Sequence, residues 1–443
     1  MDIVIGMLVT FSILILAVFN GIFMGIPLLI GFIIFAFIAW RRGFSLRDIL
    51  MMSYTGGKKS FIVLEIFILI GAITAIWMAA GTVPGIVYYG IKLMNPNYFI
   101  LCAFLISSSV SFLLGTSLGT VSTVGLALIV MAKGGNVNLD IASGAIIAGA
   151  YFGDRCSPMS SSASLVASLT ETNLFINIRN MFLSASIPFI ISVILYTIFS
   201  LEQPLSFIGT SIDNELTNIF TINWVVLLPA ILIVFFSLFR VSVKTSMVIS
   251  ILIASIISVI DQQYSVIDII EYLVLGFHLD SDSPLNTIIK GGGIISMWQA
   301  SLIVYVSCAL AGLFDGTNML RRIEEVFLRA KTHADLFFCT TVVSILTAAF
   351  GCNQSISTVL TNQLLTKTYE ERKIDKYKLA LDLENTGVVL SALIPWNIAA
   401  FVPTTTMNVS YVGFIPYAFY LYLVPLFCIL SLKLHENSSK NPQ

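Results

Sequence analysis

The chain has 443 residues, of which 57% are hydrophobic and only 11% are charged, and its mean hydropathy is +0.94. Soluble domains carry about 25% charged residues, so this composition excludes a water-soluble protein and predicts an integral membrane protein. The net charge of −1 excludes a nucleic-acid partner, which needs a basic surface. The six cysteines form no CxxC pair, and we predict neither disulfides nor a bound cofactor.

Apolar runs long enough to cross about 30 Å of hydrocarbon recur along the chain. They predict an all-α polytopic membrane protein whose spans lie at 3–19, 21–39, 61–91, 141–169, 174–199, 223–239, 244–260, 293–314, 379–408 and 411–432. Two further pairs of short apolar arms, 98–132 and 335–366, each close on a small polar tip. We interpret these pairs as re-entrant hairpins, giving about ten spanning helices plus two hairpins.

The charged loops predict how the chain lies in the membrane. The basic loop 41–60 belongs in the cytoplasm by the positive-inside rule. Counting one crossing per span then places the basic loops 321–331 and 367–378 inside, and the acidic segments 200–222 and 261–292 outside. We predict a protein of the plasma membrane with both termini in the cytoplasm.

Sequence landmarks recur at an offset of about 235 residues. Five crossings per half is an odd number, so the halves should be inverted relative to each other, as in many transporters. We predict a first inverted repeat at 1–200, an extracellular linker at 201–222, a second repeat at 223–435 and a cytoplasmic tail at 436–443. The matching landmarks are Gly56-Gly57 with Gly291-Gly292, Gly81-Thr82 with Gly316-Thr317, Gly115 with Gly351, and Pro158 with Pro395.

The segment GDRCSP at 153–158 interrupts the span 141–169, and a broken helix in a bilayer is tolerated where it lines a cavity. Asp154 would lie near mid-membrane, which makes it a functional candidate; the alternatives are an ion pair with Arg155 or a helix cap. Hydroxyl oxygens around such a break suit Na⁺, although small polar residues also serve helix packing. We predict Na⁺ ligands at Asp154 and Ser157. The hydroxyl residues crowding this break and the nearby tip are Thr116, Ser117, Thr120, Ser157, Ser160, Ser161, Ser162 and Ser164.

The second half carries a corresponding set of polar residues. Glu384 is the second candidate carboxylate, although its position near a charged loop equally allows a solvated side chain. Asp382, which lies nearer that loop, is expected to be solvated. The predicted substrate- or ion-binding residues of this half are Asn353, Gln354, Glu384, Asn385 and Asn397.

Several motifs together resemble the NhaC-type Na⁺/H⁺ antiporter family of the ion-transporter superfamily. The resemblance implies inverted repeats, a site between the hairpin tips and the broken helices, cation-coupled antiport by an elevator-like motion, and a homodimer. It also implies roles for Asp154, Ser157 and Pro158, for Glu384 and Gly387, and for 395–397. The motifs are IWMAAGTVPGIVYYG (76–90), GTSLGTVSTVG (115–125), GDRCSPMSSSASL (153–165), LFxxIR (174–179), LENTG (383–387) and IPWN (394–397).

The chain departs from this family pattern at four positions. Family members usually carry an acid where Ser161, Asn353 and Asn385 stand, and an asparagine where Ser164 stands. Fewer carboxylates should weaken a Na⁺ site and remove proton acceptors. Some members of the family exchange malate and lactate, so the resemblance also allows an organic acid as substrate.

The sequence therefore predicts a secondary active transporter that exchanges Na⁺ for H⁺ by alternating access. The alternative within transport is a Na⁺- or H⁺-coupled carrier of a small organic acid or an amino acid. An intramembrane aspartyl protease needs two acids that share a proton, and no second aspartate is evident at mid-membrane. We therefore do not predict an enzyme, and a passive channel fits the broken repeat less well than alternating access does.

Overall fold

The computed structural model describes residues 2–58, 60–206, 212–239, 241–279, 291–317, 319 and 332–440. The predicted basic loop at 321–331, part of the predicted linker (207–211) and the last three residues of the predicted tail lie outside these residues. The described chain is helical, with one isolated antiparallel bridge between Phe277 and Gly291. This confirms the all-α prediction.

The first half contains two interrupted segments. A hairpin consists of α6, the short α7, a π-helical turn at Val121–Gly125 and α8. A broken helix consists of α9 and α10. The helices of this half are α1 Asp2–Phe19, α2 Gly25–Arg41, α3 Leu46–Lys58, α4 Phe61–Ala79, α5 Thr82–Leu93, α6 Phe99–Leu114, α7 Ser117–Thr120, α8 Leu126–Gly134, α9 Leu139–Cys156, α10 Ser161–Leu169 and α11 Leu174–Glu202.

The second half contains a hairpin of α18 and α19 and a second broken helix. In the latter, α20 continues into a π-helical turn at Glu384–Val388 and a 3₁₀ turn at Ser391–Leu393, and the chain resumes as α21. The helices are α12 Ile212–Ile219, α13 Leu228–Leu238, α14 Val243–Ile260, α15 Val266–Leu275, α16 Trp298–Thr317, α18 His333–Gly351, α19 Gln354–Glu371, α20 Lys376–Leu383, α21 Ile398–Met407 and α22 Phe419–Lys440.

Six helical stretches of the described residues are long and apolar enough to cross a membrane, or up to eight if each of two bent pairs forms one span. One bent pair is the second broken helix, which bends by 46° at its break. The hairpin arms Pro96–Leu114 and Ser117–Gly134 have 19 and 18 residues, so they are longer than the sequence interpretation assumed. Their length alone therefore gives no argument for re-entrance, which stays a prediction.

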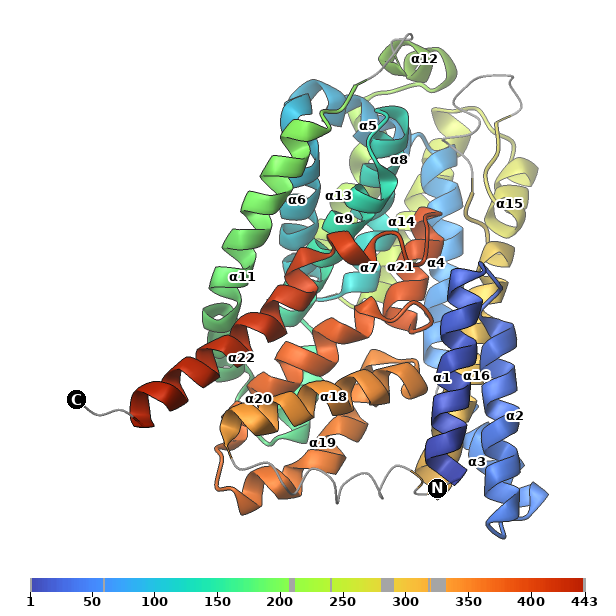
Figure 1. Cartoon of the computed structure of the whole chain (residues 1–443). Helices are drawn as coiled ribbons and strands as arrows, with labels where there is room; N and C mark the ends of the chain where they lie inside the picture. Colours follow the sequence, from blue (N-terminus) through green and yellow to red (C-terminus); the bar gives the residue numbers. More distant parts are fainter. Residues whose placement is uncertain are drawn as a thin grey trace.

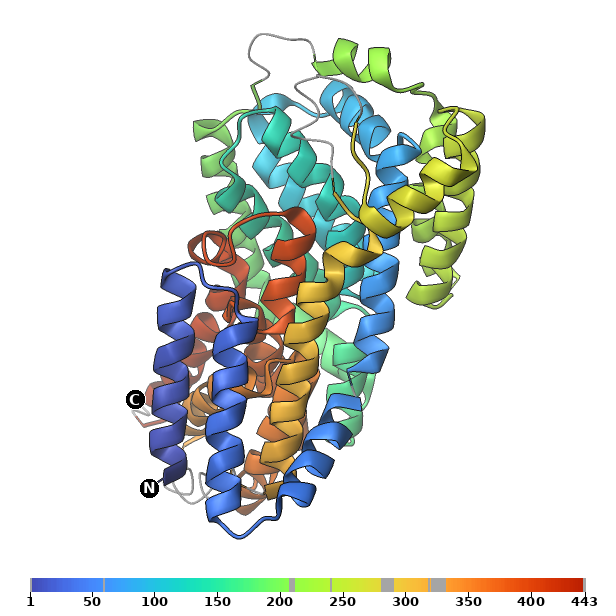
Figure 2. The ribbon, with the colours of Figure 1, turned by 90° about the vertical axis from the view of Figure 1, so that its right-hand side faces the viewer.

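The two hairpins lie at opposite ends of the molecule. Figure 1 shows α6 and α8 in the upper half and α18 and α19 in the lower half, with α7 near mid-height beside α21. The start of α1 and the end of α22 both lie in the lower half. Figure 2 shows α1, α2 and α16 side by side in one layer beside this core. The inverted repeat itself stays a prediction.

The helix starts at the tips and breaks recur with equal spacing. Thr116 caps α7 and Asn353 caps α19, while Ser160 caps α10 and Asn397 caps α21; each pair is 237 positions apart. Gly115 and Cys352, also 237 apart, end α6 and α18 with a left-handed backbone. The predicted match of Gly56-Gly57 with Gly291-Gly292 is not structural, because the first pair lies in α3 and the second in a loop.

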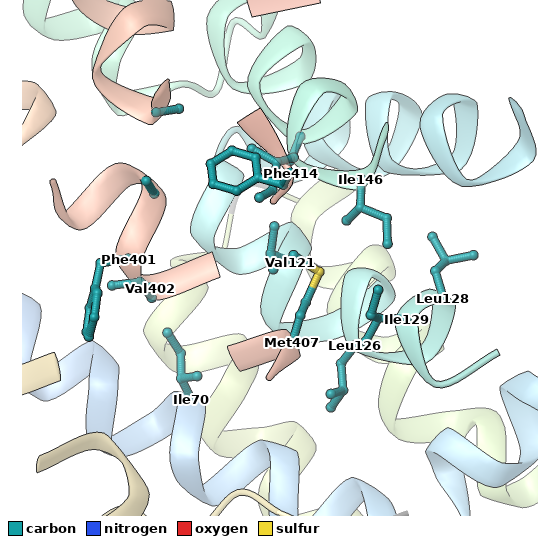
Figure 3. Packing of buried hydrophobic residues seen from close by; sticks show 14 of the residues in the cluster. Ile70, Val121, Leu126, Leu128, Ile129, Ile146, Phe401, Val402, Met407 and Phe414 are labelled. Atoms are coloured by element: carbon teal, nitrogen blue, oxygen red, sulfur yellow. The ribbon is translucent and has the colours of Figure 1, made fainter. Parts of the chain in front are cut away.

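Small residues allow the central helices to pack closely. A Cβ atom on Gly153 of α9 would lie 2.4 Å from the backbone nitrogen of Phe112 in α6. Gly56 of α3 and Gly312 of α16 face each other in the same way. Figure 3 shows the apolar core around α21, where Met407 lies beside Val121 of the π-helical turn. The breaks are thus enclosed by closely packed helices.

Candidate functional site

Two helices begin inside the protein beside the first break. The hydroxyl of Thr116 accepts a hydrogen bond from the backbone N–H of Gly119 at 3.4 Å, at the start of α7. The hydroxyl of Ser160 accepts one from Ala163 at 3.1 Å, at the start of α10. Helix N-termini carry a partial positive charge, which favours a carboxylate nearby.

Asp154 lies in the last turn of α9, within reach of both helix starts. One carboxylate oxygen, Oδ2, accepts a hydrogen bond from Ser117 Oγ at 3.0 Å. The other, Oδ1, accepts hydrogen bonds from Ser160 Oγ at 3.0 Å and from Ser162 Oγ at 3.3 Å. Asp154 is only 5% exposed. The structure therefore surrounds one buried carboxylate with three hydroxyl groups, and we call these four residues the Asp154 cluster.

The other predicted hydroxyl residues lie outside the Asp154 cluster. Ser157 donates to the carbonyl of Phe112 at 2.6 Å and accepts from the N–H of Met159, so it anchors the break to α6. Thr120 donates to the carbonyl of Thr116 at 2.8 Å within its own helix. The structure does not bring Ser161 and Ser164 to the cluster, since both are exposed.

The side chain of Arg155, which belongs to the first half of the protein, forms hydrogen bonds with residues of the second half. Its guanidinium is fully buried and donates to the Tyr420 hydroxyl at 2.9 Å, to Ser184 Oγ at 2.8 Å and to the side-chain carbonyl of Asn385. The alternative of a local ion pair with Asp154 is therefore wrong. Its Nε atom is buried without a hydrogen-bond partner. Sequence reasoning treated Arg155 only as a partner of Asp154, although a charge at that depth is itself a functional signal.

Glu384 is fully buried in the π-helical turn that follows α20, and neither carboxylate oxygen has a hydrogen-bond partner. It interacts electrostatically with both Arg155 and Asp154. The alternative of a solvated Glu384 is therefore wrong. A buried carboxylate without hydrogen bonds is costly unless its charge is balanced, so this group is suited to gain and lose a proton.

The tip and break of the second half are held together by side-chain amides and an indole. Asn397 Nδ2 donates to the carbonyl of Ala348 at 2.8 Å, and Trp396 Nε1 donates to that of Ala349 at 2.7 Å. Asn353 is occupied as the cap of α19. Gln354, which follows it, has a buried Nε2 without a hydrogen-bond partner. Of the predicted residues in this half, Glu384 and Asn385 lie near Arg155, whereas Asn397 and Asn353 hold helix starts.

Asp382 corrects another expectation, because it is buried and not solvated. Its Oδ2 lies 2.8 Å from His333 Nε2 and accepts a hydrogen bond from the Tyr369 hydroxyl at 2.8 Å. Sequence position near a charged loop was misleading here, since the partners come from α18 and α19. Of these partners, His333 begins α18.

The chain is similar to known proteins over most of its length. The model of a family described as the Na⁺/H⁺ antiporter family matches residues 149–433, which include the breaks of both broken helices. The chain belongs to the Na⁺/H⁺ antiporter family. This confirms the resemblance that the motifs indicated. Family membership implies a transporter, not an enzyme, and with the apolar helices it supports a multi-pass protein of the cell membrane.

Relatives of this family member match over most of its length. It is 29% identical over 411 residues to the malate-2H⁺/Na⁺-lactate antiporter of Bacillus subtilis, covering 89% of this chain and 87% of the relative. It is 29% identical to the Na⁺/H⁺ antiporter NhaC of the same organism, covering 91% of both chains. It is 28% identical to an uncharacterized Na⁺/H⁺ antiporter of Haemophilus influenzae, covering 91% and 89%.

Proposed function

We propose that this protein exchanges Na⁺ for H⁺ across the cell membrane by alternating access. Na⁺ would bind at the Asp154 cluster, and Glu384 would carry a proton. The observation that carries the proposal is the pairing of a carboxylate ringed by hydroxyl groups with a second buried carboxylate that has no hydrogen-bond partner.

The Asp154 cluster has the chemistry that a small hard cation prefers. Its carboxylate and three serine hydroxyls, Ser117, Ser160 and Ser162, supply oxygen ligands from two helix starts. Serine hydroxyls can rotate, so they can donate to the carboxylate when the site is empty and turn their lone pairs to a cation when it is filled. Exchange of a cation for these hydrogen bonds would leave no charge uncompensated.

Glu384 would couple the proton to the cation. Its carboxylate oxygens are buried without hydrogen-bond partners, within electrostatic reach of the guanidinium of Arg155. Because Glu384 also senses the charge of Asp154, a cation that neutralises Asp154 would change the proton affinity of Glu384. Such an interaction gives competition between the two ions, which exchange requires.

Transport in proteoliposomes with a pH-sensitive dye inside tests this proposal. After a proton gradient is imposed, addition of Na⁺ or Li⁺ should collapse it. We expect Asp154→Asn and Glu384→Gln to lose this response, with apparent rates at least about tenfold lower, because each removes a charge that binding requires. Asp140→Asn is the matched control, since Asp140 lies in the first turn of the same helix as Asp154.

The possible outcomes test the assigned Na⁺ site and the proposed exchange separately. If the wild-type protein responds to Na⁺ but Asp154→Asn does so equally well, the assigned site is wrong. If the wild-type protein does not respond to Na⁺ or Li⁺, the proposed exchange is wrong. Purified variants that keep the melting temperature of the wild type exclude misfolding as the cause of a loss.

Arg155 favours a second candidate, Na⁺- or H⁺-coupled exchange of a small organic acid. A guanidinium binds carboxylates well, and its buried Nε has no partner. One relative is a malate-2H⁺/Na⁺-lactate antiporter. A response to malate or lactate in the same proteoliposomes, without a response to NaCl, would select this candidate. Arg155→Gln should then abolish the response to the acid.

A further inference from the structure

A cavity of about 400 Å³ lies beside the tip of the first hairpin. It is lined by Val110 and Leu114 of α6, by Val124 of the π-helical turn, by Trp77 of α4 and by residues of α13. Leu114 is followed directly by Gly115, the residue that ends α6 at the tip. No residue of the Asp154 cluster lines this cavity, and the proposed exchange does not use it.

The lining of the cavity is hydrocarbon in character. Only two of the residues that line it, Trp77 and Thr123, carry a polar side-chain group. Trp77 Nε1 donates a hydrogen bond to Ser250 Oγ at 2.9 Å, and Thr123 Oγ1 donates one to the carbonyl of Gly119 at 2.8 Å. A buried water needs about two to four polar partners, and both polar side chains here already have theirs. The cavity therefore suits an apolar occupant better than water or an ion.

The cavity continues onto the outward face of α13. Ile231 and Phe235, which lie one helical turn apart and both line the cavity, are 54% and 48% exposed. They belong to the apolar helical stretch Trp224–Phe236, and exposed apolar side chains of a multi-pass protein face the hydrocarbon of the bilayer. Trp77 is only 1% exposed. The cavity thus leads from the lipid-facing surface to a buried side chain.

We propose that an acyl chain of a membrane phospholipid occupies this cavity and packs against the tip of the first hairpin. An engineered apolar cavity of about 150 Å³ stays dry and binds benzene, so a cavity of about 400 Å³ has room for a longer hydrocarbon. An empty cavity would cost its lining the dispersion contacts that a filled one provides. The bilayer supplies acyl chains at the exposed end, beside Ile231 and Phe235.

Quenching of tryptophan fluorescence by brominated lipid tests this proposal. Bromine quenches an indole only at short range, so phosphatidylcholine that is brominated in the middle of its acyl chains reports contact with Trp77. The starting protein keeps the two buried tryptophans, Trp77 and Trp396, of which only Trp77 lines the cavity. The three exposed tryptophans are replaced in it, as Trp40→Phe, Trp224→Phe and Trp298→Phe.

Two matched variants of this starting protein isolate the cavity. Val234→Phe places an aromatic ring at a position that lines the cavity, and it should lower the quenching severalfold because it excludes the acyl chain. Val248→Phe makes the same change at an exposed position of α14 outside the cavity, and it should leave the quenching unchanged. Equal quenching in the two variants would overturn the proposal, because the cavity would then be empty or filled by the protein itself.

The melting temperature gives a second readout in the protein with all its tryptophans. A ligand that binds only the folded protein raises its stability. In digitonin, a detergent without a linear alkyl chain, added phosphatidylcholine should raise the melting temperature of the wild type and of Val248→Phe. The rise should be severalfold smaller for Val234→Phe, and glycerophosphocholine, which has no acyl chain, should cause none.

An equal rise in Val234→Phe and Val248→Phe, or a rise with glycerophosphocholine as large as that with phosphatidylcholine, would overturn the proposal. Neither readout measures ion movement. The acyl-chain site can therefore be confirmed or rejected whatever ion the protein exchanges, and failure of the proposed exchange leaves this result unchanged.

Discussion

At the residue scale, two neighbouring charges serve different halves of the protein. Asp154 accepts hydrogen bonds from serines of the first half, whereas Arg155 donates to Asn385 and Tyr420 of the second. The structure shows where two of the departures from the family pattern lie. Ser161 and Ser164 are exposed, so the acid missing at position 161 and the asparagine missing at position 164 take no ligand from the Asp154 cluster as it stands.

Neighbouring serines of this segment give a matched test. Ser160→Ala removes both a hydrogen bond to Asp154 and the cap of α10, and we expect it to cost about 1–2 kcal/mol of stability. It should also lower the apparent Na⁺ affinity severalfold, as should Ser117→Ala. Ser161→Ala, one position along the chain, should leave the Na⁺ dependence of dye recovery unchanged and stability within about 0.5 kcal/mol. Equal effects of Ser160→Ala and Ser161→Ala would contradict this assignment.

The sequence identified Asp154 because a charge in an apolar, Pro-broken segment is conspicuous. It could not separate Ser160 and Ser162 from Ser161 and Ser164, since that choice depends on which side of α10 faces α9. The state of Asp382 was not predictable either. Its partner His333 is 49 positions away, and composition near a loop says nothing about such a contact.

At the element scale, the breaks are built from caps and close approaches. Gly115 ends α6 at φ 66°, and a Cβ there would lie 2.5 Å from the backbone of Met159 at the first break. The hairpin tip can therefore contact the broken helix closely because the residue at this position has no side chain.

Substitution of Gly115 separates backbone strain from this close approach. Gly21 also has a positive φ, 63°, but has no neighbour within 4 Å of an added Cβ. Gly21→Ala should cost about 1–2 kcal/mol from the left-handed backbone alone. Gly115→Ala should lower the melting temperature further and abolish Na⁺ transport, because Met159 must shift. If both variants melt and transport alike, the contact with Met159 has no role in seating the tip.

The interrupted segments were predictable because Gly, Pro and Asn interrupt otherwise apolar runs. Their caps were predicted less well, since Asn353 and Asn397, which were assigned to binding, also hold the starts of α19 and α21; their role in binding stays a prediction. The π-helical turns that carry Glu384 and Val121 leave no signature in hydrophobic periodicity. A turn of this kind is decided by packing against other helices.

At the scale of the whole molecule, a cavity of about 300 Å³ separates α3 and α16 from the second hairpin. The cavity is lined by Gly312 and Asp315 of α16, by Ser355 and Gln363 of α19, and by Leu165 of α10. It therefore extends along the contact between the outer helix layer and the elements that carry the breaks. Relative motion of these two bodies would change its volume.

Thiol labelling can follow that motion. Ser355→Cys places a thiol on an exposed position in this cavity near the tip of the second hairpin. We expect a membrane-impermeant maleimide to label it from the side that the charged loops predict as cytoplasmic, and Na⁺ to change the labelling rate. Ser186→Cys on the exposed face of α11 is the control that lipid should shield. Labelling of Ser355→Cys from the opposite side would invert the predicted orientation.

The guanidinium of Arg155 has a consequence for how this chain varies through evolution. One buried cation of α9 donates a hydrogen bond to the π-helical turn after α20, so the residues at positions 155 and 385 are physically coupled. A lineage that replaces Arg155 with an uncharged residue leaves the carbonyl of Asn385 without its donor. We therefore expect the two positions to change together among relatives.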